Sequence, residues 1–109
     1  MSSEEQQGDS FKVAELLLES GADPNARDDN NDTLLHLASK NGHVEVAKML
    51  LDRGVDANAR NNDNAIPLHF ASQGGHPEIV RMLLDCRADV NARDNNCKTP
   101  LHCMLEDAW

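Results

Sequence analysis

The chain is poor in aromatic residues, with two Phe, one Trp and no Tyr among its 109 residues. We therefore expect a core of aliphatic side chains and no large pocket lined by aromatic rings. Basic residues are also scarce: 10 Lys and Arg stand against 19 Asp and Glu, for a formal net charge of -9. Because phosphate binding depends on clustered Lys and Arg, this balance argues against nucleic acid and favours a protein partner with a basic or neutral surface.

Long apolar runs and a cysteine framework are missing as well. No stretch approaches the length that a membrane span needs, and the segment 1–7 lacks the basic and then apolar order of a secretory signal, so we expect no membrane contact. The three cysteines, Cys86, Cys97 and Cys103, have no framework spacing. This pattern favours free thiols in the cytoplasm, with the nucleus as an alternative.

The sequence does contain internal repetition at an interval of 33 residues. Three similar tetrapeptides each end in histidine: Thr33–His36, Ile66–His69 and Thr99–His102. An Asn-Ala-Arg triplet keeps the same register and begins at Asn25, Asn58 and Asn91. Repetition with a period of this size is typical of a solenoid.

Each unit has the pattern of a loop followed by two short helices. In the central unit, the Asn- and Asp-rich segment 28–32 predicts a turn, and Thr33 is a suitable N-cap. Helices are expected at about 34–40 and 44–52, with a glycine at position 42 to end the first. Helices this short are marginal alone, so stacking on neighbouring units must stabilise them.

A unit of this length around the motif T-P-L-H resembles the ankyrin repeat. Thr99–His102 matches the motif in full, and Gly42-His43, Gly75-His76 and Gly21–Ala26 match further family positions. The resemblance implies an all-α solenoid of stacked helix-turn-helix units with projecting hairpin loops. It also implies a non-enzymatic module that binds other proteins and needs no cofactor.

In this register the first and last units are incomplete. We expect a polar N-terminal tail or short polar capping helix over 1–9, a partial repeat over 10–31, full repeats over 32–64 and 65–97, and a partial repeat with a cap helix over 98–109. Ser10 is the expected N-cap of the helix over 11–19. At the other end, Met104 and Leu105 replace the small residues of earlier units, and we expect them to fill the space of the missing helix.

Three departures from the family pattern predict local weakness. Asn31, Asn64 and Cys97 stand where the family places glycine, and we expect the third hairpin to be distorted because cysteine adopts the left-handed conformation less readily than asparagine. Ile66 replaces the capping threonine, and Arg87 replaces the glycine that ends the second helix. Each of these two changes is expected to cost about 1 kcal/mol.

The regular histidines invite a catalytic or metal-binding interpretation, which the spacing of units disfavours. Equivalent atoms in stacked units lie roughly 8 to 10 Å apart, too far to share one metal ion or proton. The resemblance implies instead that His36, His69 and His102 have structural roles, hydrogen-bonded near Thr33 or Thr99 and the adjoining loop backbone.

Other candidate sites are weaker still. Cys86, Cys97, His102 and Cys103 lack the CxxC spacing of a zinc site. The sequence has no nucleophile elbow, phosphate-binding glycine loop or helical metal motif. We therefore predict neither a metal site nor an enzyme.

Partner contacts in the resembling family come from the hairpin tips and the exposed end of each first helix. Carried over by position, they form one polar, mildly acidic surface, which we name the hairpin strip. Its residues are Asp29, Asn30, Asp32, Lys40, Asn41, Asn62, Asp63, Ala65, Gln73, Gly74, Asn95, Asn96, Lys98, Glu106 and Asp107.

Two classes of function are compatible with this sequence. The first is a monomeric protein-binding module, of which an engineered scaffold without a natural partner would be a variant. The second is a self-assembling unit, in which the N-terminal half unit of one molecule stacks head-to-tail on the C-terminal half unit of another.

Overall fold

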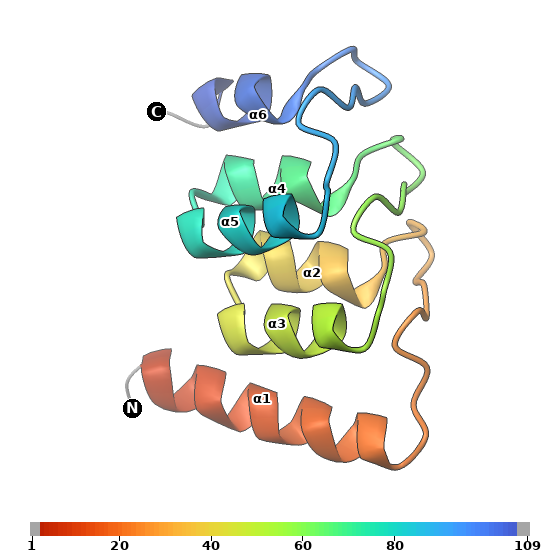
Figure 1. Cartoon of the computed structure of the whole chain (residues 1–109), viewed down its shortest axis with the longest axis vertical. Helices are drawn as coiled ribbons and strands as arrows, with labels where there is room; N and C mark the ends of the chain where they lie inside the picture. Colours follow the sequence, from red (N-terminus) through yellow and green to blue (C-terminus); the bar gives the residue numbers. More distant parts are fainter. Residues whose placement is uncertain (1–2, 107–109) are drawn as a thin grey trace.

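The computed structural model describes residues 3–106, with side chains from residue 9 onward. These residues form six helices (Figure 1): α1 (Ser3–Glu19), α2 (Leu34–Asn41), α3 (Val44–Asp52), α4 (Pro67–Gly74), α5 (Pro77–Asp85) and α6 (Pro100–Glu106). An isolated antiparallel bridge joins Arg27 to Thr33 at the base of one hairpin. No helix within 3–106 combines the length and the apolar character that crossing a membrane requires.

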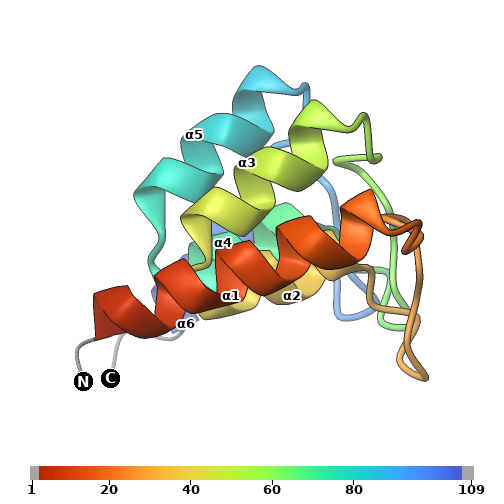
Figure 2. The same cartoon turned by 90° about the horizontal axis from the view of Figure 1, so that it is seen from below.

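The helices lie in two layers, as Figures 1 and 2 show. The inner helices α2, α4 and α6 stack on one another, and the outer helices α1, α3 and α5 form a second stack beside them. Within a complete unit, α2 pairs with α3 and α4 pairs with α5. The expected all-α solenoid of helix-turn-helix units is therefore confirmed.

Local signals set the ends of the inner helices. Thr33 caps α2, because its Oγ1 accepts the backbone N–H of His36 at 3.2 Å. Gly42 ends α2 in the left-handed conformation, with φ at 72°, and Gly75 does the same for α4 at 71°. Pro67 occupies the first turn of α4, where the missing N–H is tolerated.

The replacement of the capping threonine by Ile66 brings a compensating gain that the sequence did not reveal. Ile66 provides no side-chain cap, but its side chain is 0% exposed and belongs to the aliphatic core. Full burial of an isoleucine contributes about 1.5–3 kcal/mol, which exceeds the roughly 1 kcal/mol of a lost cap. Burial of Ile66 therefore offsets the loss of the cap, and the net effect on stability at this position stays a prediction.

The hairpins are regular, including the third. Asn31, Asn64 and Cys97 have φ values of 63°, 62° and 63°. The N–H of Cys97 donates to the carbonyl of Asp94 at 3.0 Å, as that of Asn31 does to Asp28 at 2.9 Å. The expected distortion at Cys97 is therefore absent, because the neighbouring hydrogen bonds hold cysteine in the same backbone conformation.

The N-terminal helix is longer than expected. α1 runs without interruption from Ser3 to Glu19, so Ser10 lies inside a helix and does not cap one. Glu and Gln are good helix formers, and no proline interrupts the segment, so the helix continues past the serine. Figure 2 shows the N-terminal half of α1 projecting past the turn between α2 and α3.

The C-terminal end is less closed than expected. Met104 and Leu105 on α6 are 41% and 61% exposed, and therefore do not fill the position of a missing outer helix. The core itself is a strip of aliphatic side chains between the two layers, and Leu35, Leu50 and Leu83 are among its largest fully buried members.

Candidate protein-binding surface

The hairpin tips are held in shape by a side chain at the start of each hairpin. Oδ1 of Asp28 accepts the backbone N–H groups of Asn30 and Asp32, both at 3.0 Å. Asn61 and Asp94 make the equivalent pair of bonds in the next two hairpins, at 2.9 Å each. Each tip is therefore preorganised by its own unit.

Neighbouring hairpins are also bonded to one another. The N–H of Asn62 donates to the carbonyl of Asn30 at 3.0 Å, and that of Asn95 donates to Asp63 at 2.9 Å. The side chain of Asn62 donates to the carbonyl of Asp29 at 3.2 Å, and that of Asn95 to Asn62 at 3.1 Å. The three tips thus form one continuous surface.

A ladder of arginines reinforces this surface. A guanidinium nitrogen of Arg27 donates to the carbonyl of Arg60 at 2.8 Å, and that of Arg60 donates to Arg93 at 3.2 Å. Both steps span the 33-residue interval, so the Asn-Ala-Arg triplets seen in the sequence join one unit to the next.

Histidines connect the inner helices to the following hairpin. Nδ1 of His36 accepts the N–H of Thr33 at 3.1 Å, so Nε2 carries the proton and donates to the carbonyl of Ala65 at 2.9 Å. His69 bonds Ile66 and Lys98 in the same way. Burial lowers the pKa of His36, with a smaller opposing effect from its bond to Ala65.

His102 lacks the contact between Nε2 and a carbonyl of the following hairpin. Its Nδ1 lies 2.9 Å from Oγ1 of Thr99, as Nδ1 of His36 does from Oγ1 of Thr33. Within 3–106, however, no following hairpin offers a carbonyl to its Nε2. The imidazole is exposed, whereas His36 and His69 are buried.

Most of the hairpin strip is exposed, but Asp32 and Lys98 are half-buried and Ala65 is buried. Ala65 is 4% exposed, so its side chain does not reach a partner, and its carbonyl is occupied by His36. Ala65 therefore does not belong to the exposed surface of the strip, because its side chain is buried. Asp107 lies outside the described residues.

Several strip residues are already engaged within the molecule. Asn62 and Asn95 bond the preceding hairpin, and Asp32 accepts the side-chain amide of Asn61 at 2.8 Å. Nζ of Lys98 lies 2.9 Å from a carboxylate oxygen of Glu106, and this hydrogen bond raises the pKa of Lys98. Asn recurs in register at positions 62 and 95, and at both positions its side chain joins neighbouring hairpins.

Asn41 is engaged too, since its side-chain amide donates to the carbonyl of Leu37 at 2.9 Å. Six strip side chains have no partner among the described residues. They are Asp29, Asn30, Lys40, Asp63, Gln73 and Asn96.

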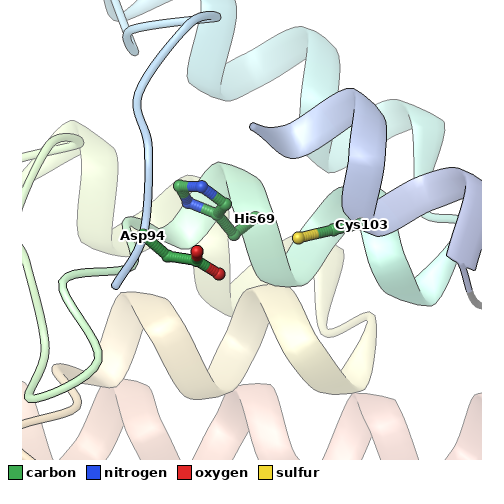
Figure 3. Close-up of side chains that lie close together, drawn as sticks. All are labelled: His69, Asp94 and Cys103. Atoms are coloured by element: carbon green, nitrogen blue, oxygen red, sulfur yellow. The ribbon is translucent and has the colours of Figure 1, made fainter. Parts of the chain in front are cut away.

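One cluster of potential metal ligands arises that the sequence did not indicate. His69 on α4, Asp94 in the last hairpin and Cys103 on α6 bring one ligand atom each within 4.8 Å of one another (Figure 3). Both nitrogens of His69 already bond the backbone, and the carboxylate of Asp94 holds its hairpin. Burial, together with Asp94 and Glu106, raises the pKa of Cys103, which disfavours the thiolate that a metal needs. We interpret the cluster as part of the hairpin framework.

Comparison with known proteins agrees with this geometry. A family model described as ankyrin repeats (3 copies) matches residues 3–94 and 66–106. The chain belongs to the ankyrin-repeat family. Ankyrin repeats are generally protein-protein interaction modules, which directs attention to the hairpin strip of this chain. None of the curated proteins compared with the chain matches it.

Proposed function

We propose that this ankyrin-repeat chain is a non-enzymatic module that binds another protein through its hairpin strip. The observation that carries the proposal is the bonding between hairpin tips: the backbone is fixed, while the carboxylates of Asp29 and Asp63 have no partner among the described residues. A surface already held in its bound shape loses little conformational entropy on binding.

The chemistry of the surface favours a basic partner. Its free acidic groups, Asp29 and Asp63, lie in a chain with 19 acidic and 10 basic residues. Opposite charges across an interface raise the association rate and select against acidic partners. Such binding weakens as salt screens the charges.

Two further observations support a non-enzymatic role and a location in a reducing compartment. Both imidazole nitrogens of His36 and of His69 are engaged in structural hydrogen bonds, which leaves neither as a ready catalytic base. The three cysteines are free, which suits a reducing compartment such as the cytoplasm or nucleus.

The test is affinity capture followed by a quantitative binding measurement with the captured partner. We expect the double variant Asp29→Lys and Asp63→Lys to bind at least tenfold more weakly, at an unchanged melting temperature. The double variant Asp52→Lys and Asp85→Lys places the same charge change at exposed positions on the outer helices α3 and α5 and serves as the matched control. Equal affinity for the double variant, or an equal loss in the control, would overturn the hairpin strip as the binding surface.

A further inference from the structure

The N-terminal end of the array exposes apolar positions that internal units bury. Val13, Leu16 and Leu17 on α1 are 55%, 54% and 57% exposed. In the 33-residue register, Leu17 corresponds to Leu50 and Leu83, which are 1% and 0% exposed. The face of α1 is therefore a core face that lacks its covering helix.

The C-terminal end shows the same property. Its exposed large apolar side chains are Leu84, Val90, Leu101, Met104 and Leu105. Leu101 is 63% exposed, whereas its equivalents Leu35 and Leu68 are 1% and 2% exposed. Among the residues from 9 to 106, every exposed large apolar side chain belongs to one of these two ends.

The two ends have complementary shapes (Figure 1). The N-terminal end has an outer helix, α1, but no inner helix beneath α2 in the described chain, and an apolar groove of about 510 Å³ lies between α1 and α2. The C-terminal end has an inner helix, α6, but within residues 3–106 no outer helix above α5, and an apolar groove of about 410 Å³ lies beside α6. Each end presents the helix that the other lacks.

We propose that a second copy of this chain covers each end, so that molecules join head-to-tail. In the joint, α6 of one copy stacks on α2 of the next, as α4 stacks on α2 within one chain. α1 of the second copy then lies above α5 of the first, and α6 and α1 together make a complete unit. The joint continues an interface that the chain already uses twice between its inner helices.

Hydrogen-bond partners are in place for this joint. The Nε2 of His36 and of His69 each bond a carbonyl 29 residues further on. In the 33-residue register, the position 29 residues after His102 is occupied in the joint by Asp32 of the second copy. The Nε2 of His102 would therefore donate to the carbonyl of that Asp32. Within one copy the arginine ladder ends at Arg93. In the joint, the guanidinium of Arg93 would donate to the carbonyl of Arg27 in the second copy, as Arg27 and Arg60 donate to the next unit within one chain.

A histidine at the N-terminal groove gives independent support. His76 bonds the carbonyl of Lys40 in the preceding unit at 3.2 Å. Its equivalent His43 lines the groove beside α2, where its Nε2 corresponds to the atom by which His76 bonds Lys40. In the joint, the imidazole of His43 meets the end of α6 of the preceding copy, where Glu106 takes the place of Lys40.

The larger side chains on α6 can be accommodated. Leu105 takes the position of Ser39, and the α2 face that it meets presents Leu37 where the internal interface presents the larger Phe70. Met104 is unbranched and adapts to irregular space. Each copy carries a net charge of -9, so salt should strengthen this association, whereas it should weaken binding to a basic partner.

The test is sedimentation equilibrium of the purified chain over a wide concentration range, at low and high salt. We expect the average mass to rise beyond that of a dimer with concentration, and to rise further in high salt. Leu17→Lys blocks the N-terminal end and Leu101→Lys the C-terminal end; both side chains are more than half exposed, so the fold should persist. Each variant alone should stay monomeric, and an equimolar mixture should form a 1:1 dimer and nothing larger.

Three outcomes would overturn the proposal. They are a wild-type chain that stays monomeric throughout, a dimer that survives in either single variant, and a mixture that fails to associate. Gln73→Lys is the matched control, because it adds the same charge at an exposed position of the hairpin strip. An equal loss of association in this control would also count against the joint. Because Asp29 and Asp63 at the hairpin tips line neither groove, the binding test at these two residues can succeed or fail independently of this one.

Discussion

The Nε2 of His36 donates a hydrogen bond of 2.9 Å to the carbonyl oxygen of Ala65, which lies 29 residues further along the chain. This bond joins an inner helix to the hairpin of the following unit, and its donor is completely buried. The repeated histidine is thereby a connector between units, and its removal should be felt as a loss of stability.

Replacing His36 by alanine should lower the free energy of unfolding by about 2–4 kcal/mol. The change leaves the buried N–H of Thr33 without its acceptor and opens a cavity beside Phe70, whose ring packs edge-on against the imidazole at 5.5 Å. Urea unfolding followed by circular dichroism measures the loss. His102→Ala is the matched control and should cost less than about 1 kcal/mol because His102 is exposed. Equal costs would show that the connecting bond contributes nothing.

Acid should destabilise the chain through the same residue. Burial lowers the pKa of His36 below 6.5, so the unfolded chain binds a proton at a pH where the folded chain does not. The stability that comes from keeping His36 neutral is therefore fully present above pH 6.5 and is lost as the pH falls below it. Melting temperatures at about pH 7.5 and about pH 5.5 should differ more for the wild type than for His36→Gln, which cannot titrate. Parallel curves for the two proteins would contradict this assignment.

The turn between α2 and α3 should be less tolerant of a side chain than the turn after α3. Gly42 and Gly54 both have positive φ, at 72° and 81°, so alanine is strained at either position. A Cβ on Gly42 would also lie 2.7 Å from Cε1 of His76, whereas a Cβ on Gly54 would meet nothing within 4 Å. Gly42→Ala should therefore cost about 1 kcal/mol more than Gly54→Ala. The difference should vanish when His76 is also replaced by alanine, and a double-mutant cycle checks this.

Thiol reactivity should differ between two cysteines close in sequence. Cys103 is half-buried, and its pKa is raised by burial and then by Asp94 and Glu106, so little thiolate is present at neutral pH. Cys97 is exposed in the third hairpin. Mass spectrometry after brief alkylation should find Cys97 modified at least several-fold faster than Cys103. Faster modification of Cys103 would instead point to opening of α6.

Local signals in the sequence predicted much of this fold, and the failures have a common cause. Thr33 and Gly42 act on the backbone next to them, so the bounds of α2 and α3 followed within about a residue. Ser10 failed because serine is compatible with a helix interior as well as a cap. Burial of Ala65 and of Ile66 depends on a neighbouring unit, which no local pattern describes.

For the candidate surface, too, local sequence predicted some features, and contacts with a neighbouring unit determined the others. Its location at the hairpin tips could be inferred from the repeat, but its chemistry depends on which side chains are already bonded. Asp63 has no partner among the described residues, whereas Asn62 beside it bonds the preceding hairpin. Only the relative placement of two units distinguishes these neighbours.

The short reach of the contacts between units has a consequence for how the chain folds. Between the residues that the structure describes, the hydrogen bonds that connect one unit to the next join residues about one repeat apart, and the largest sequence separation is the 36 residues between His76 and Lys40. Closing so small a loop costs little chain entropy, and low contact order goes with fast folding. A nucleus can therefore form at any adjacent pair of units and extend in both directions, so that a nascent chain can complete its first pair before synthesis ends.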